Sequence, residues 1–194
     1  MESLIEQIFA AHWAEHGALL CGIGYALLIV KRNRWAWCFG ALSSSLLVWL
    51  AAGAGLPLQA ALQGVYVLMA GYGFWRWTKA AEQNAVVAVS IWPRWRHAVA
   101  ALGIIVLAFT VGRLLAEHTD AAWPRLDAAV TAMSLLATWM TARALLENWL
   151  YWLVVDAISF FLYYSQGLIF VAVLYVVYFV IALFGFRAWW PHRP

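Results

Sequence analysis

Long apolar runs, separated by short polar or charged breaks, organise almost the whole chain. A transmembrane helix needs about 20 mostly apolar residues. Seven runs approach that length, over residues 15–30, 35–52, 57–77, 97–116, 125–145, 148–164 and 167–189. Residues 78–96, which end in Trp92-Pro93-Arg94-Trp95-Arg96, are too polar and too interrupted to span a bilayer. The pattern predicts an all-α integral membrane protein with seven transmembrane helices.

Composition supports this prediction. The chain has 194 residues, of which 66% are hydrophobic and 11% are charged, whereas a soluble domain is about half apolar and about a quarter charged. The net charge of +3 comes from Lys and Arg near the helix ends, so it indicates membrane topology rather than nucleic-acid binding. Cys21 and Cys38 lie in apolar runs without metal-ligand spacing, and we interpret both as packing residues.

The Lys and Arg residues fall unequally on the two sides of the membrane. With seven spans, one side receives only Arg113 and Arg125. The other side receives ten residues: Lys31, Arg32, Arg34, Arg76, Lys79, Arg94, Arg96, Arg143, Arg187 and Arg193. The positive-inside rule therefore predicts an outside N-terminus and a cytoplasmic C-terminus. Residues 1–6 lack the basic start of a signal peptide, so we expect the first helix to be retained.

The sixth apolar run carries five residues that are polar or can form hydrogen bonds on one helical face: Asn148, Trp152, Asp156, Ser159 and Tyr163. Their spacings of four, four, three and four residues place them together on an α-helix. A carboxylate facing lipid costs several kcal/mol, so this face must look inward, and an acid inside the membrane indicates a functional site. The alternative is a structural hydrogen bond between helices.

Other segments supply further candidates for the same site: Trp37, Ser44, Gln63, Tyr66, Trp139 and Tyr175. Aromatic faces stack on flat rings and attract cations. Amides and a carboxylate can bind carboxamide or hydroxyl groups. Together these residue types predict a cage for a small organic ligand, although any single one of them could instead connect two helices.

The third and seventh runs end alike, with Tyr72-Gly73-Phe74-Trp75-Arg76-Trp77 matching Phe184-Gly185-Phe186-Arg187-Ala188-Trp189. The same offset pairs Gly55 with Gly167 and Tyr66 with Tyr178. Allowing one short gap upstream pairs Trp37 with Trp152 and Ser44 with Ser159. The pattern indicates an internal repeat.

Both repeat units begin on the same side of the membrane, so they are parallel. We expect an N-terminal three-helix bundle over residues 15–77, a linker helix over 97–116 and a C-terminal three-helix bundle over 125–190. This 3+1+3 plan is typical of transporters that hold their substrate near mid-membrane between the halves.

Several function classes lack support. The sequence has no phosphate-binding Gly-Lys-Ser/Thr loop, and no nucleophile–base pair of the kind that hydrolases use is evident. The five His residues lie at helix ends without metal-ligand spacing: His12, His16, His97, His118 and His192. We expect no enzyme activity, no metal and no cofactor.

The motifs carry a family resemblance. The chain resembles the PnuC family of bacterial vitamin transporters over about residues 15–190 in Arg34-Trp35-Ala36-Trp37, Gln63-Gly64-Val65-Tyr66, Tyr72–Trp77, Glu147-Asn148-Trp149, Trp152, Val155-Asp156, Tyr163, Gly167-Leu168 and Gly185–Trp189. The resemblance implies a SWEET-like fold, a homotrimer in the inner membrane and nicotinamide riboside as the main substrate. It also implies facilitated diffusion, with a cytosolic kinase trapping the ligand by phosphorylation. Relatives carry thiamine or riboflavin.

Two questions stay open at the level of the sequence. A lone deep acid, Asp156, favours a uniporter but can also serve proton coupling. A hypothesis from another class is a membrane scaffold whose polar face binds a partner helix.

Overall fold

The structure is a computed structural model, and it describes residues 13–83, 86–119 and 122–193. Over these residues it contains seven long helices and no β-sheet, which confirms the all-helical prediction. The helices are α2 (Trp13–Val30), α3 (Ala36–Gly53), α4 (Pro57–Glu82), α5 (Arg94–His118), α6 (Pro124–Ala142), α7 (Asn148–Ser165) and α8 (Ile169–Trp189). A short 3-10 helix, Trp190–His192, follows α8. The signal-peptide expectation falls on residues 1–6, outside the described residues.

Three boundaries differ from the predicted segments by three residues or more. Helix α4 continues past Trp77 to Glu82, because the added residues include the strong helix formers Lys79, Ala80 and Ala81. Helix α5 already begins at Arg94, directly after Pro93. Helix α6 ends at Ala142 rather than at 145. The apolar pattern marks the membrane-embedded part of a helix, whereas the helix itself can continue into water.

Four helical segments are long and apolar enough to cross a membrane by length and composition: Trp13–Val30, Ala36–Gly53, Arg94–His118 and Ile169–His192. The other three long helices carry the polar side chains that the sequence placed on inward faces, such as Gln63 on α4 and Asp156 on α7. These polar residues lower the mean hydropathy of α4, α6 and α7. The lower hydropathy of these three helices therefore indicates that they contribute to a polar surface inside the protein.

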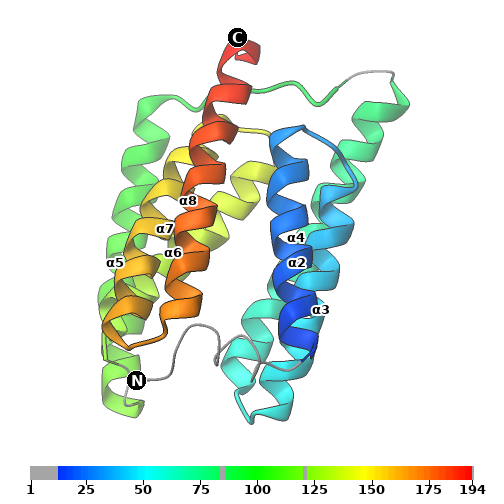
Figure 1. The fold of residues 1–194 in the computed structure, drawn as a ribbon. Helices are drawn as coiled ribbons and strands as arrows, with labels where there is room; N and C mark the ends of the chain where they lie inside the picture. Colours follow the sequence, from blue (N-terminus) through cyan, green and yellow to red (C-terminus); the bar gives the residue numbers. More distant parts are fainter. Residues whose placement is uncertain (1–12, 84–85, 120–121, 194) are drawn as a thin grey trace.

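The helices form two groups (Figure 1). Helices α2, α3 and α4 lie on one side, and α5 to α8 lie on the other. Within the groups, α3 packs on both α2 and α4, and α7 packs on both α6 and α8. Helix α5 packs along α6. Contacts between the two groups run from α4 to α6 and from α2 to α8.

Matching turns recur in the two groups at one constant separation. Gly55 and Gly167 have φ values of +70° and +76°, and they lie 112 positions apart. Arg32 and Ala144 have φ values of 52° and 53°, and they also lie 112 positions apart. Only glycine adopts this left-handed region at little cost. The same unfavourable conformation at Arg32 and Ala144 therefore indicates that the two turns are equivalent positions of a repeat. The upstream gap that the sequence alignment introduced is wrong, because the constant separation pairs Trp37 with Trp149.

Four indoles form a buried cluster at one end of the helices. We call Trp37, Trp77, Trp149 and Trp189 the tryptophan cluster, and the end of the molecule where it lies the tryptophan end. All four are at most 4% exposed. Trp37 packs on Gly73, and Trp149 packs on Gly185 in the matching position. Trp37 meets Trp77 edge to face at 5.5 Å, and Trp149 meets Trp189 edge to face at 5.3 Å.

Two hydrogen bonds of the tryptophan cluster connect the helix groups. The Trp77 Nε1–H on α4 donates to the carbonyl of Ala142, the last residue of α6, at 3.1 Å. The Trp189 Nε1–H on α8 donates to the carbonyl of Val30, the last residue of α2, also at 3.1 Å. Donors and acceptors are both related by the 112-residue separation. Each group therefore binds the end of a helix in the other group.

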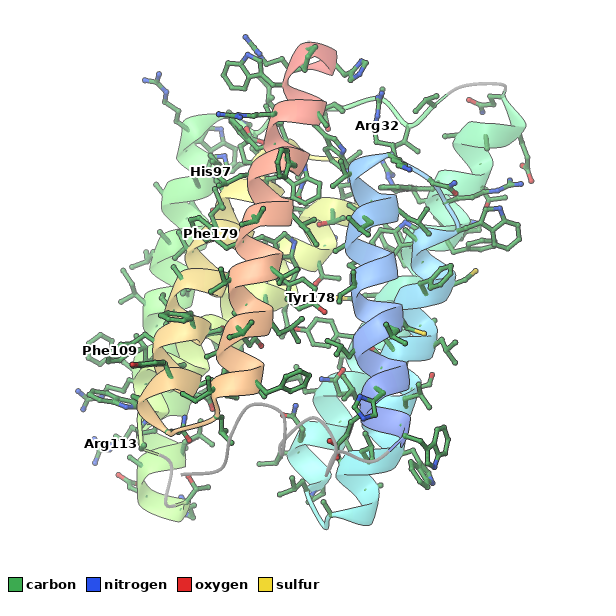
Figure 2. All side chains as sticks on the ribbon, in the orientation of Figure 1. Arg32, His97, Phe109, Arg113, Tyr178 and Phe179 are labelled. Atoms are coloured by element: carbon green, nitrogen blue, oxygen red, sulfur yellow. The ribbon has the colours of Figure 1, made fainter. Side chains whose placement is uncertain are left out.

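The connection between α4 and α5 crosses the tryptophan end. Ser90 N–H donates to the Ala144 carbonyl at 3.0 Å, and Leu146 N–H donates to the Ser90 carbonyl at 2.9 Å. From the other group, the Arg32 guanidinium donates to the Val87 carbonyl at 3.3 Å. Figure 2 shows Arg32 and His97 at this end of the molecule and Arg113 at the opposite end. The connection therefore contacts both helix groups.

Candidate functional site

A cavity of about 940 Å³ lies between the two helix groups. At one end its lining includes residues at or beside the starts of α4 and α6, namely Pro57 and Trp123, and Gln166 just after α7. At the other end it reaches Ile29 and Trp149, and Trp149 is a member of the tryptophan cluster. The lining thus extends from the end opposite the tryptophan cluster into the protein interior, and the buried indoles close it there.

The lining is aromatic, polar and, where it is ionisable, acidic. It includes five tyrosines and three tryptophans, which are Tyr25, Tyr66, Tyr163, Tyr175, Tyr178, Trp123, Trp149 and Trp152. It also includes two acids, three glutamines and four hydroxyl residues, which are Asp127, Asp156, Gln59, Gln63, Gln166, Thr131, Ser134, Thr141 and Ser159. No Lys, Arg or His of the described residues lines the cavity. The site therefore suits neutral or cationic groups.

Helix α7 positions the deep carboxylate. Its polar positions recur at helical spacing, so Asp156 and Ser159 turn inward together and are only 3% and 2% exposed. Two phenols lie near Asp156, those of Tyr175 and Tyr178 on α8. Neither ion pair found among the described residues, Arg113–Glu117 and His97–Glu147, involves Asp156.

Tyrosines of α4 and α8 reach across the interface at matching positions. Tyr66 of α4 lies near Ser134 on α6. Tyr178, which is 112 positions later, points from α8 toward α2 in Figure 2. There its hydroxyl lies so close to Gly22 that a Cβ on that glycine would stand 2.6 Å away. Both phenols thus form part of the boundary between the helix groups.

Seven of the predicted site residues line the cavity: Gln63, Tyr66, Trp152, Asp156, Ser159, Tyr163 and Tyr175. They come from α4, α7 and α8, and the structure brings them together around one space. The Tyr163 and Tyr175 rings stack at 5.3 Å with an interplanar angle of 11°. The Trp152 Nε1–H donates to Thr141 Oγ1 at 3.4 Å.

Two predicted residues are structural instead. Trp37 is 1% exposed and fills the space above Gly73. The sequence repeat with a gap pairs Trp37 with Trp152, whereas the constant separation of 112 residues pairs Trp37 with Trp149. Asn148 is fully buried at the start of α7, where its side-chain amide donates to the Leu145 carbonyl and its Oδ1 accepts from Thr141. The side chain of Asn148 therefore supplies hydrogen bonds that stabilise the turn between α6 and α7.

Ser44 and Trp139 also lie away from the cavity lining. The neighbouring Ser43 is the buried serine on α3, and it donates to the Ala18 carbonyl at 2.7 Å. Trp139 packs against Trp92 at 5.6 Å, with the Arg143 guanidinium 5.4 Å from its ring. Trp139 thus belongs to the contact between α6 and the α4–α5 connection.

The predicted set of site residues leaves out several residues that line the cavity: Tyr25, Gln59, Asp127, Ser134, Thr141, Gln166 and Tyr178. The spacing of Gln59 to Gln63 and Tyr66 was a usable signal, because all three share a helical face. The internal repeat already pairs Tyr178 with the predicted site residue Tyr66, which was a second usable signal. Tyr25 stands alone in an apolar helix, so no spacing distinguishes it. Within the described ranges, no group of three or more His, Cys, Asp or Glu could hold a metal ion.

Comparison with known proteins shows the family of this chain. A family model described as nicotinamide mononucleotide transporter matches residues 12–191. The riboflavin/roseoflavin transporter RibM of Streptomyces davaonensis is 28% identical over 185 residues, which cover 92% of this chain and 84% of that protein. The nicotinamide riboside transporter PnuC of Escherichia coli is 26% identical over 143 residues, 61% of this chain and 60% of that one.

A solved structure shares the fold. The crystal structure of the vitamin B3 transporter PnuC matches with a TM-score of 0.73 and 22% identity, covering 96% of this chain and 85% of that chain. The family match spans nearly all of the described helices. The chain is therefore a multi-pass membrane protein that belongs to the nicotinamide mononucleotide transporter family, the PnuC family of transporters that its motifs predicted.

Proposed function

We propose that this protein carries nicotinamide riboside across the bacterial inner membrane by facilitated diffusion. The observation that carries the proposal is the cavity lining, which combines eight aromatic side chains with two carboxylates and, among the described residues, no basic group. Nicotinamide riboside has a flat cationic ring, a carboxamide and a ribose. Aromatic faces and a carboxylate favour the cation, while glutamines and hydroxyls can bind the other two groups.

The same lining disfavours a phosphorylated ligand. A phosphate monoester carries up to two negative charges near neutral pH and is normally bound by Arg, Lys or backbone N–H groups. Here it would face Asp127 and Asp156 without a basic side chain in the described lining. We therefore assign the nucleoside rather than the mononucleotide as the substrate. Phosphorylation after entry, by a separate cytosolic kinase, would then trap the ligand.

Riboflavin is the second candidate. RibM, whose name assigns it riboflavin, is similar to this chain over 92% of the chain. Riboflavin is also flat, polyhydroxylated and free of phosphate, and ligand pockets of about 300–1,000 Å³ hold molecules of this size. Thiamine, which is aromatic and cationic, fits the same chemistry. A charged ring favours the deep Asp156, so we place nicotinamide riboside before riboflavin. We place it before thiamine because the similar PnuC carries nicotinamide riboside by its name.

We further propose the SWEET-like 3+1+3 arrangement, with residues 15–77 and 125–190 as parallel halves and residues 97–116 within the linker helix α5. The matched turns and the two tryptophan hydrogen bonds at a constant separation support it. The ten Lys and Arg residues of one side support a cytoplasmic tryptophan end and C-terminus and an outside N-terminus. A homotrimer remains a proposal from the family resemblance.

Binding to purified protein tests the proposal. Calorimetric titration with nicotinamide riboside, nicotinamide mononucleotide, riboflavin and thiamine should give saturable binding of nicotinamide riboside and none of the mononucleotide. Trp152→Ala should abolish the binding, because it removes a lining indole. Saturable binding of riboflavin alone would replace the proposed substrate. Binding of none, with assembly disturbed by Trp152→Ala, would favour the scaffold function instead.

A further inference from the structure

Tyr25 on α2 lines the cavity, although nothing in its sequence context distinguished it. Its ring packs against Gly40 of α3, where an added Cβ would stand 2.9 Å from Tyr25 Cδ2. On another side it meets Trp37 edge to face, with ring centroids 5.6 Å apart and an interplanar angle of 67°. Gly40 and the buried indole of Trp37 therefore fix where this phenol lies.

The hydroxyl of Tyr25 is buried and has no hydrogen-bond partner among the described residues. A buried polar group without a partner is costly, and native structures usually satisfy it. Tyr66, another lining phenol, lies close enough to interact electrostatically with it. The free hydroxyl can both donate and accept, so it can bind a ligand group that enters the cavity.

The 112-residue separation relates the contact between Tyr25 and Gly40 to Ala137 and Trp152 of the other half, where Trp152 is a cavity-lining indole. The position that matches Gly40 is Trp152, and the position that matches Tyr25 is Ala137. In one half the ring comes from α2 and stands over a glycine of α3. In the other half the ring is on α7, and the matching residue of α6 is small. A large and a small side chain have exchanged places, so this pair of positions supplies an aromatic ring to the cavity lining in each half.

We propose that Tyr25 and Trp152 form a pair of aromatic walls, one from each half, and that the Tyr25 hydroxyl hydrogen-bonds the ligand. The ligand class this pair fits is a flat heteroaromatic ring, neutral or cationic, with a hydrogen-bonding substituent at its edge. The inference rests on the proposed transport function and adds a specificity-determining residue to it. Because the walls belong to different halves, ligand binding also bridges the interface between them.

The test begins with Tyr25→Phe and Tyr25→Leu in the purified full-length protein. Dissociation constants for nicotinamide riboside, riboflavin and thiamine are measured by calorimetry, and the melting temperature is measured without ligand. Tyr25→Phe should weaken binding of the recognised vitamin about 3- to 10-fold, the usual range for one lost hydrogen bond. It should leave the melting temperature unchanged or raised, since it removes an unsatisfied buried group. Tyr25→Leu should weaken binding further.

Two glycine variants distinguish the effect of shifting the Tyr25 ring from the effect of disturbing the packing of α2 on α3 in general. Gly40→Ala would push its Cβ against the Tyr25 ring, and Gly24→Ala would push its Cβ against Phe39 Cδ1, also at 2.9 Å. Phe39 is 42% exposed, and neither Phe39 nor Gly24 lines the cavity. Gly40→Ala should therefore weaken ligand binding, whereas the matched control Gly24→Ala should not.

The outcomes distinguish this inference from the function on which it rests. If the unmodified protein binds none of the three vitamins, the proposed function and the inference fall together. If it binds one of them and Tyr25→Phe binds that vitamin equally well, the function stands and the role of Tyr25 is overturned. Equal weakening by Gly40→Ala and Gly24→Ala would likewise show that the packing of α2 on α3, and not the position of the Tyr25 ring, controls affinity.

Discussion

Asp156 shows how much one side chain determines in an apolar interior. It is 3% exposed, and its neighbours are phenols rather than basic groups. A carboxylate in such a place needs a compensating charge or donor, which a cationic ligand can supply. The same side chain thereby sets the charge preference of the cavity, while the uncharged aromatic residues around it accept flat rings of either kind.

We expect Asp156→Asn to discriminate between the candidate vitamins. Losing a charged partner in a buried site should weaken nicotinamide riboside binding about 10- to 100-fold. Riboflavin, which is uncharged, should lose much less. The measurement is calorimetric titration of both vitamins, with Glu117→Gln as the control, because Glu117 is exposed and paired with Arg113 on α5. Equal losses for both vitamins would argue against direct contact of Asp156 with a cation.

The sequence could predict Asp156 but not the role of Trp37, and the reason is physical. A charged residue in an apolar run must face inward, so its environment follows from its chemistry. An indole satisfies a core position, a membrane interface or a ligand cavity equally well. Trp37 is a core residue because Gly73 on the neighbouring helix has no Cβ and leaves room for the indole. This contact between helices cannot be read from the sequence around Trp37. Tyr25 escaped prediction for the same reason, since Gly40 and Trp37 determine its position.

At the scale of helices, the close approach of α7 to α8 depends on one glycine. Trp149 lies over Gly185, and a Cβ there would stand 2.5 Å from three carbons of the indole. The same arrangement joins α3 to α4 through Trp37 and Gly73. Small residues that allow close helix contact are the usual means of packing in membranes. The order of the helices was readable from apolar periodicity, but these close contacts required the three-dimensional pairing.

Gly185→Ala should destabilise the protein by about 1–3 kcal/mol, the usual range for overpacking a well-filled core. Gly71→Ala on α4 is the matched control, because a Cβ there meets nothing within 4 Å. Alanine should even favour the helix slightly at that exposed site. Thermal unfolding in detergent measures both variants. Equal melting temperatures for the two would contradict the packing role of Gly185.

Helix ends also determine whether the tryptophan end is closed. We expect Trp189→Phe and Trp77→Phe each to raise access to the cavity from that end about 2- to 10-fold, if opening breaks the bond that each indole makes. A cysteine at position 29, which is 2% exposed and lines the cavity, can report the change by its rate of labelling with a membrane-impermeant maleimide.

Trp190→Phe provides the comparison for this labelling experiment. Trp190 is 46% exposed and packs on Phe186 instead of joining the tryptophan cluster. Its replacement should leave the labelling rate of the cysteine unchanged. If Trp77→Phe and Trp189→Phe also leave the rate unchanged, the two indole hydrogen bonds do not hold the tryptophan end closed.

At the scale of the whole molecule, the two helix groups enclose one cavity and touch through α4–α6 and α2–α8. Such an arrangement can expose a central site alternately to each side when one group rocks against the other. The sequence predicted the two groups and the site between them. The sequence could not predict which end of the cavity is closed in the structure. The same apolar pattern fits a protein that is open to either side of the membrane.

Transport by the reconstituted protein should need no ion gradient. Asp156 is the deep acid of the cavity, and no partner for a charge relay was found for it among the described residues. In liposomes, labelled nicotinamide riboside should therefore equilibrate across the membrane without accumulating, at the same final level with or without a pH gradient. Accumulation that follows an imposed pH gradient would establish proton coupling.

The two bonds that close the tryptophan end have an evolutionary consequence. Their acceptors are the main-chain carbonyls of Val30 and Ala142, which every amino acid provides. Substitution can therefore alter this closure only through the donors, Trp77 and Trp189, or by moving the helices themselves. Selection on the balance between open and closed forms would act mainly on these two positions, while residues 30 and 142 stay free to vary in side chain within the limits of packing.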